Sequence, residues 1–184
     1  RLLQSPFTLH AGVIARIERE TAHARAGRPA RIIAKMNALN EPQVMRTLYE
    51  ASQAGVQIDL IVRGACALRP GVPGVSENIR VRSIVGRFLE HHRVYWFAND
   101  GQPDLFCASA DWLERNLLRR VETGFPILDP DIATRVKTES LDNYLADNLN
   151  AWMLREDGRY EKLVPEDDAM PHSAQGWLLA HLCG

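Results

Sequence analysis

The feature that most restricts the fold is a strand–helix–strand pattern near the start of the chain. Residues 31–36 and 57–62 are short, mostly apolar runs, as is typical of strands buried on both faces of a sheet. Between them lies an expected helix that begins at Asn40, its predicted N-cap, and ends at Gly55. Strands joined by such a crossover run parallel, so the sequence predicts an α/β domain.

Further patterns complete a mixed sheet flanked by helices. Asp111 and Glu114 have the spacing of a capping box at the start of a short helix, and residues 99–101 are typical of a hairpin turn. The other expected helices cover residues 8–25, a long stretch from 129 to about 149 and residues 173–183; the other expected strands cover 79–84, 93–97, 105–109, 121–127 and 159–163. We predict one domain over residues 1–165, followed by a linker and terminal helix over residues 166–184.

Length and composition are those of a globular cytosolic protein. The chain has 184 residues, of which 46% are hydrophobic and 24% charged, enough for one well-packed core. No apolar run approaches the roughly 20 residues that span a bilayer, so we predict no transmembrane segment. Because the chain begins with Arg1 rather than Met, we interpret it as part of a longer polypeptide. Cys66, Cys107 and Cys183 lack metal-ligand spacing and are predicted to be reduced thiols.

Charge is unevenly distributed along the chain. The net charge of −1 argues against general nucleic-acid binding. However, residues 63–93 contain six arginines and two acids, whereas residues 139–168 contain nine acids. The guanidinium group offers a planar fork of donors that matches phosphate oxygens. The middle of the chain therefore indicates an anion site, although any one of these arginines could instead be a solvated surface residue.

Polar residues follow several of the predicted strands. Lys35 and Asn37 lie at the end of one strand, Arg63 directly follows the next, and residues 109–111 follow the hairpin. Ligands of open α/β sheets bind beyond the carboxyl ends of the strands. The sequence therefore predicts that these groups converge on one site.

His91 is the strongest candidate for chemistry. It can donate a proton, attack phosphorus or hydrogen-bond an oxyanion, and Arg93 lies on the same side of an extended chain. A packed or capping histidine explains the short pattern equally well. The sequence has no P-loop, no dinucleotide-binding glycine motif and no nucleophile elbow. It also offers no carboxylate pair for a metal, because Asp111 is expected to cap a helix.

Longer segments carry a resemblance to a known family. The pattern from His91 to Arg93, followed by residues 109–111, is similar to the His-x-Lys motif of the phospholipase D superfamily, with Arg in place of Lys. As a set, in order, the segments resemble the large, multidomain bacterial polyphosphate kinases. They are Ser5–Phe7, Gly27–Asn37, Ile61–Cys66 with Leu68 and Pro70–Gly71, Ser76–Ile79, Arg87–His91 with Arg93, Ser109–Trp112, Arg115–Asn116, Arg119–Glu122 and Pro126–Ile127.

The resemblance implies a role as well as a fold. It points to the last domain of such an enzyme, the second of two phospholipase D-like domains. The family transfers the terminal phosphate of ATP reversibly to inorganic polyphosphate through a phosphohistidine, which belongs to a preceding domain absent from this chain. Its Mg²⁺ ligands are also expected outside the chain. The implied partners are ATP or ADP, polyphosphate and the remaining domains, in a homo-oligomeric, cytoplasmic enzyme; peripheral attachment to the inner membrane face stays open.

The resemblance also assigns roles to individual residues. It places Arg63 and His91 at the phosphates of ATP, with His91 as an assisting catalytic group. Our second-rank candidates for phosphate contact are Lys35, Asn37, Arg93 and Arg115. Two alternatives remain: a phosphodiesterase that uses His91 as nucleophile, or a non-catalytic module that binds nucleotide or polyphosphate. We expect the chain alone to lack kinase activity.

Overall fold

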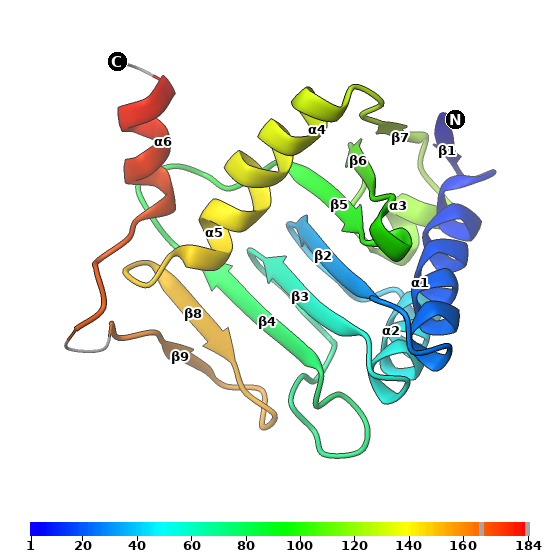
Figure 1. Cartoon of the computed structure of the whole chain (residues 1–184), viewed down its shortest axis with the longest axis horizontal. Helices are drawn as coiled ribbons and strands as arrows, with labels where there is room; N and C mark the ends of the chain where they lie inside the picture. The colour runs from blue at the N-terminus through cyan, green and yellow to red at the C-terminus, as the bar shows by residue number, and fades with distance from the viewer. Residues whose placement is uncertain (166–167, 183–184) are drawn as a thin grey trace.

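A single mixed sheet organises the molecule. The computed structural model describes residues 1–165 and 168–182 (Figure 1). Over that part of the chain, nine strands follow the order β1-β7-β6-β5-β2-β3-β4-β8-β9. Their bounds are β1 (Leu3–Ser5), β2 (Arg31–Met36), β3 (Gln57–Val62), β4 (Ile79–Ile84), β5 (Arg93–Phe97), β6 (Asp104–Ala108), β7 (Glu122–Pro126), β8 (Ala151–Leu154) and β9 (Tyr160–Lys162). The central strands β2, β3 and β4 are parallel and the flanking pairs are antiparallel, which confirms the predicted mixed α/β sheet.

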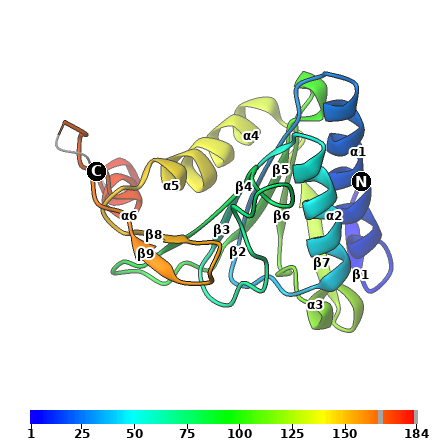
Figure 2. The same ribbon diagram turned by 90° about the horizontal axis from the view of Figure 1, so that it is seen from below.

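Helices lie on both faces of this sheet (Figures 1 and 2). The pair α1 and α2 covers one face, and α4 and α5 cross the other. The helices are α1 (Leu9–Arg25), α2 (Pro42–Gln53), α3 (Glu114–Leu118), α4 (Pro130–Lys137), α5 (Asn143–Ala146) and α6 (Ala174–Leu182). A π-helical turn over Thr138–Asp142 joins α4 to α5, and a 3-10 turn over Asn99–Gly101 joins the β5–β6 hairpin.

The alternation of side chains along β2 divides the core in two. Ile32 and Ala34 pack with α1 and α2 in the larger apolar cluster. Ile33 points to the opposite face and packs with residues of α5 and α6. Because successive side chains of a strand alternate between faces, Lys35 lies on the same face as Ile33. This alternation of side chains decides on which face of the sheet the Lys35 ammonium group lies.

Two predicted helix starts are wrong. Glu41 rather than Asn40 caps α2, and its carboxylate accepts a hydrogen bond from Val44 N at 2.6 Å. The capping box at Asp111 does not form: α3 begins at Glu114, and no side chain caps it. The predicted long helix from 129 is also wrong in part, since it is interrupted by the π-helical turn and ends at Ala146.

The short strands β1 and β8 were not predicted, because three or four residues give too little pattern. In the tail, α6 attaches to the domain through the buried residues Ala174 and Gln175. Residues 166–167 of the predicted linker, Cys183 at the end of the predicted helix and Gly184 lie outside the described residues. No described helix is long and apolar enough to cross a membrane.

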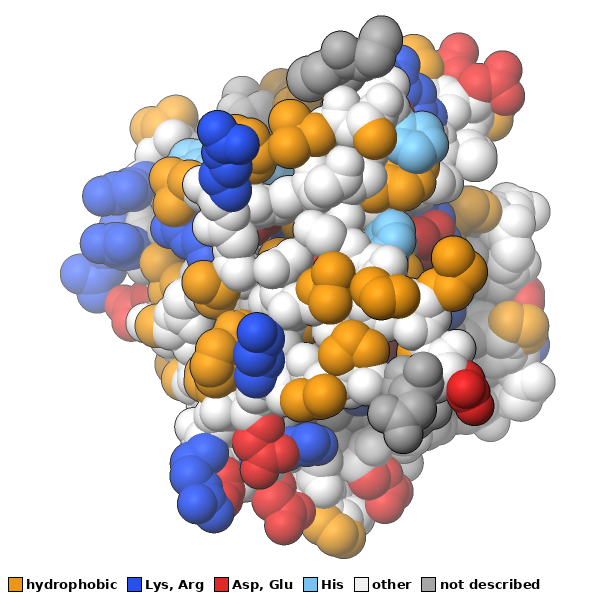
Figure 3. All heavy atoms as spheres, turned by 90° about the vertical axis from the view of Figure 1, so that its left-hand side faces the viewer, with side chains coloured by type: hydrophobic (Ala, Val, Ile, Leu, Met, Phe, Trp, Pro, Cys, Tyr) orange, Lys and Arg blue, Asp and Glu red, His pale blue; other side chains and the backbone are white. Residues whose placement is uncertain are grey.

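The end of the molecule that carries α6 presents many apolar side chains. Figure 3 shows hydrophobic side chains gathered on this face. Phe88, Leu89, Leu179 and Leu182 belong to it, with exposed fractions between 42% and 75%. They line a shallow depression that lies between α6 and the loop that precedes β5. We call this set of side chains the apolar face.

Candidate functional site

The topology brings four chain segments to one edge of the sheet. The parallel strands β2 and β3 end there, at Met36 and Val62. Because β5 runs antiparallel to β2, its first residue, Arg93, begins at the same edge, and it pairs with Ala108 at the end of β6. The residues that follow β2, β3 and β6, and those that precede β5, therefore converge, as expected for a ligand site of an α/β sheet.

An open pocket of about 460 Å³ lies at this edge. That volume lies within the range of small-molecule binding sites. The residues that line it are Asn37, Arg63, His91, Arg93, Ser109, Asp111, Arg115, Asn116, Arg120 and Glu122. Five of our six candidate site residues are among them, and Lys35 is the exception.

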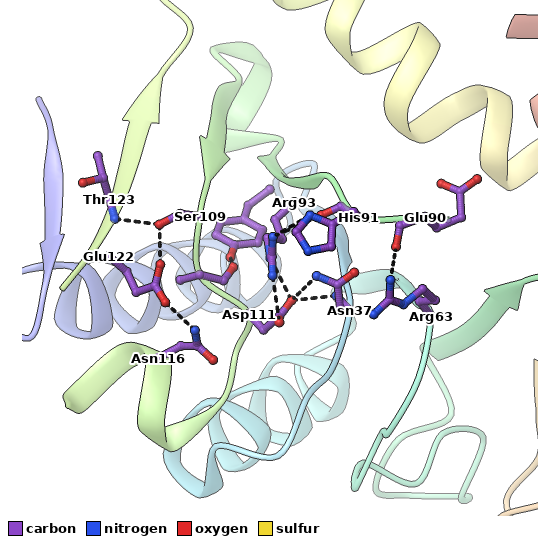
Figure 4. A network of polar contacts seen from close by, with 12 residues as sticks. Asn37, Arg63, Glu90, His91, Arg93, Ser109, Asp111, Asn116, Glu122 and Thr123 are labelled. Carbon is purple, nitrogen blue, oxygen red and sulfur yellow. Dashed lines mark hydrogen bonds and ion pairs between the residues drawn. The ribbon is translucent and has the colours of Figure 1, made fainter. Parts of the chain in front are cut away.

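Asp111 is the anchor of the pocket. Its Oδ1 accepts hydrogen bonds from the backbone N of Asn37 at 2.7 Å and from the Asn37 Nδ2 at 3.0 Å (Figure 4). Its two oxygens also bind the Arg93 guanidinium, with Nε at 3.1 Å and NH2 at 3.2 Å. The carboxylate that we expected to cap a helix therefore ties the end of β2 to the start of β5.

His91 lies next to this ion pair. The NH1 group of Arg93 is 3.3 Å from the His91 Nδ1 and donates to the His91 carbonyl at 3.1 Å. A guanidinium can only donate, so Nδ1 acts as the acceptor, and the proton of the neutral imidazole is on Nε2. The exposed ring of His91 can thus donate from Nε2 to a ligand in the pocket.

Arg63 enters the pocket from the end of β3. Its NH1 donates to the Glu90 carbonyl at 2.9 Å, which fixes the guanidinium beside His91 (Figure 4). Its backbone N donates to the Met36 carbonyl at 3.2 Å, and Gly64 N donates to the Asn37 carbonyl at 2.9 Å. These contacts join the ends of β2 and β3 and leave most donors of the Arg63 side chain available.

A second carboxylate organises the opposite wall. Glu122, at the start of β7, accepts hydrogen bonds from the Ser109 hydroxyl and from the Asn116 Nδ2. The Ser109 Oγ in turn accepts from Thr123 N at 3.0 Å. Ser109, Asn116 and Glu122 therefore form a hydrogen-bonded network, although the buried Asn116 Oδ1 has no partner among the described residues.

The pocket carries an excess of positive charge. Among the described residues, Arg63, Arg115 and Arg120 have no carboxylate within ion-pair distance, whereas Arg93 is paired with Asp111. Three guanidinium groups without an acidic partner around one pocket favour an anion with several charged oxygens.

Lys35 does not line the pocket. Its side chain points to the other face of the sheet, where its Nζ pairs with the Glu90 carboxylate and lies 3.8 Å from the centre of the Tyr144 ring. Burial lowers the Lys35 pKa to about 8, although the charge of Glu90 opposes the shift. The side chain therefore lies beneath the loop that carries His91 and holds Glu90.

The carboxylates of the pocket are not arranged to hold a metal ion. Asp111 is occupied by Arg93 and Asn37, and Glu122 by Ser109 and Asn116. Over the described ranges, no group of three or more His, Cys, Asp or Glu side chains could hold a metal. The residues present here do not fit a Mg²⁺ site of their own.

Comparison with protein families matches residues 2–175 to "Polyphosphate kinase C-terminal domain 2". The chain belongs to this family. It is 76% identical over 181 residues to the polyphosphate kinase of Xylella fastidiosa (strain Temecula1 / ATCC 700964), an alignment that covers 98% of this chain and 26% of that protein. The crystal structure of polyphosphate kinase from Porphyromonas gingivalis matches all of this chain and 28% of its own, with a TM-score of 0.95 and 38% identity.

This polyphosphate kinase domain also shares its fold with a more distant protein. A phospholipase D family member, Nuc from Salmonella typhimurium, matches 75% of this chain and 88% of its own, with a TM-score of 0.54 and 14% identity. That likeness shows the fold, and it confirms the predicted phospholipase D-like α/β domain. The domain spans about a quarter of the length of the Xylella relative.

The sequence alone did not single out Asn116, Arg120 or Glu122 as site residues. Arg120 and Glu122 follow the short helix α3, in a segment with three arginines between positions 115 and 120. That local density of positive charge was a usable signal for Arg120. Glu122 lies in a segment that carries the family resemblance, but nothing in the sequence indicated its contacts, since its partners Ser109 and Asn116 come from two other segments.

Proposed function

We propose that this domain supplies the ATP-phosphate contacts of a polyphosphate kinase, which transfers the terminal phosphate of ATP reversibly to inorganic polyphosphate. The observation that carries the proposal is the pocket at the sheet edge, which His91 lines together with three guanidinium groups that have no carboxylate partner among the described residues. Phosphoryl transfer depends on positioning and on neutralising charge more than on covalent chemistry from many residues. Membership of the polyphosphate kinase family supports the same reading.

Two residues hold the central roles in this proposal. Arg63 binds two non-bridging oxygens of the ATP phosphates with the donors that Glu90 leaves available. His91 donates from Nε2 to the phosphate that departs, and Arg93 keeps the imidazole in that tautomer. Asn37 and Arg93 hold the pocket together through Asp111, and Arg115 and Arg120 add charge along its wall.

The rest of the reaction is assigned to other parts of the enzyme. The relatives are about four times as long as this chain. We propose that the phosphohistidine and the groups that hold Mg²⁺ belong to those parts, because no carboxylate of the pocket is available for a metal. The apolar face also supports a domain that packs against other protein surface, since exposed apolar patches usually mark interaction sites.

The phosphodiesterase alternative has less support. It needs His91 as nucleophile and a second histidine motif from elsewhere. The likeness to a phospholipase D family member, at 14% identity, is a likeness of fold. Arg93, which replaces the lysine of that motif, forms an ion pair with Asp111.

Titration with ATP and with polyphosphate tests the proposal. We expect Arg63→Ala and His91→Ala to weaken binding of at least one ligand, because each removes a donor to phosphate. Arg28→Ala is the control: it removes an exposed arginine that pairs with Asp100, outside the pocket. In the full-length enzyme, loss of Arg63 or His91 should slow phosphoryl transfer by about 10²–10³-fold. Equal affinities for the wild type and both pocket variants would remove these residues from the site.

The chain by itself is expected to be inactive as a kinase. It lacks the histidine that our proposal assigns to another domain. Incubation of the purified 184-residue chain with ATP and Mg²⁺ should therefore give no polyphosphate above background, as measured by incorporation of labelled phosphate. Sustained synthesis by this chain would contradict the division of labour proposed here.

A further inference from the structure

The Glu90 side chain is a buried carboxylate that two elements of the fold hold from different directions. Lys35 of β2 pairs with one of its oxygens, and Gln175 of α6 donates to the other from Nε2 at 2.6 Å. The Lys35 Nζ in turn lies 3.8 Å from the centre of the Tyr144 ring of α5. None of these partners lines the phosphate pocket. A carboxylate so fully engaged on the far side of the sheet needs an explanation beyond the pocket itself.

We propose that Glu90 is a positioning residue for Arg63 and His91, and that Gln175 clamps it in place from the terminal helix. This inference rests on the function proposed for the pocket. Figure 4 shows the arrangement: the carbonyl of Glu90 points to the Arg63 guanidinium, and its side chain points away from the pocket. His91 is the next residue along the chain. The orientation of the Glu90 backbone therefore sets the position of both groups.

The segment that carries these residues has no backbone pairing of its own within the described part of the chain. Residues 86–92 belong to no helix or strand, and within the described part of the chain they make no backbone–backbone hydrogen bond. The Gln175 amide makes the hydrogen bonds to this backbone that a neighbouring strand would otherwise make. Its Oε1 accepts from Phe88 N at 2.9 Å, and its Nε2 donates to the Phe88 carbonyl at 2.8 Å as well as to Glu90. One side chain of α6 thus fixes the segment at two residues.

Gly86 shows how closely the Gln175 amide lies against this segment. A Cβ atom at position 86 would lie 2.5 Å from the Gln175 Oε1 and 2.8 Å from its Cδ. Real Cβ atoms do not approach other atoms so closely, so an alanine there must displace the amide. Gly86→Ala and removal of the Gln175 amide are therefore expected to damage the same contact, and their effects should not multiply.

Steady-state kinetics of the full-length enzyme test the clamp. Gln175→Met keeps the length of the side chain and removes its hydrogen bonds. A small displacement of positioned groups slows chemistry more than it weakens binding, so we expect kcat to fall at least about tenfold while the KM for ATP changes less than about threefold. The matched control is Gln53→Met, which removes an exposed hydrogen bond to the Gly74 carbonyl far from the pocket and should leave kcat unchanged. The melting temperatures of wild type and both variants are measured alongside, so that a change in kcat is assigned to positioning and not to loss of folded protein.

A double-mutant cycle gives the second readout. Gly86→Ala and Gln175→Ala should each lower kcat, and the double variant should be no slower than Gln175→Ala alone. The inference is overturned if Gln175→Met keeps the wild-type kcat, or if the two substitutions multiply. Arg63→Ala in the same assay separates the two hypotheses. If Arg63→Ala keeps full activity, the proposed function fails; if it is impaired while Gln175→Met is not, only the positioning inference fails.

Discussion

Replacing Lys35 with methionine leaves a buried carboxylate without its cation. The side chains of Lys35 and Glu90 are 3% and 7% exposed. Two unit charges about 3 Å apart attract by about 5 kcal/mol at an effective dielectric constant of about 20. Breaking a buried pair by removing one partner usually costs about 3–5 kcal/mol. Because Gln175 still donates to Glu90, we expect Lys35→Met to lower the free energy of unfolding by about 3 kcal/mol at neutral pH, the lower end of that range.

The cost should also depend on pH, with a definite sign. In the wild type, burial raises the Glu90 pKa, but the charge of Lys35 and the hydrogen bonds outweigh it and hold the pKa below its ordinary value of 4.5. The ionised Glu90 therefore contributes stability above about pH 4.5 and loses that contribution as the pH falls, whereas the lowered pKa of Lys35, about 8, opposes it at neutral pH. In Lys35→Met, burial acts without the cation, so the Glu90 pKa rises above the unfolded value. Protonation of Glu90 then removes the unpaired buried charge in the variant. The difference in unfolding free energy between wild type and Lys35→Met should therefore be smaller at pH 5 than at pH 7.

Urea unfolding at the two pH values measures this effect. The double variant Lys35→Met/Glu90→Gln removes the uncompensated charge and should recover more than half of the loss, because an amide still accepts from Gln175. Arg80→Met is the control: it removes one exposed partner of the buried Asp59, which keeps Arg31, and should cost less than about 1 kcal/mol. A Lys35→Met variant within about 1 kcal/mol of wild type, or a deficit independent of pH, would refute the reasoning.

Three further results are expected. Trp112→Ala should cost about 3–5 kcal/mol in urea unfolding, since this fully buried ring packs against Tyr95; a cost below about 1 kcal/mol would contradict its place in the core. Burial raises the Cys66 pKa to about 11, so its alkylation by iodoacetamide, followed by peptide mapping, should keep accelerating about tenfold per pH unit above pH 9. A rate that levels off near pH 9, as for an ordinary thiol, would be inconsistent with that burial. Polyphosphate affinity should fall as NaCl rises, and the slope should be shallower for Arg120→Ala than for wild type or Arg28→Ala. Equal slopes for all three proteins would remove Arg120 from the site.

Much of the fold was predictable because its signals are local. The apolar runs at 31–36 and 57–62 are readable residue by residue, and a helix between them requires the parallel pairing that the structure has. The same reasoning brought Asn37 and Arg63 to one edge of the sheet. It could not fix helix starts, since Asn40 and Glu41 both offer an acceptor and only the backbone geometry selects Glu41.

The sequence by itself determined most of the strands, the parallel pairing of β2 and β3 across their crossover helix, and the supply of arginines for an anion site. Tertiary structure decided which charges reach that site. Lys35 and Asn37 are two residues apart, yet Lys35 lies beneath the sheet edge because it shares the face of Ile33, where Glu90 is its partner. Asp111 was predicted to cap a helix from its spacing to Glu114, but it binds Asn37, 74 residues away, and Arg93. Such contacts depend on distances between segments that meet only after folding, and no local pattern encodes them.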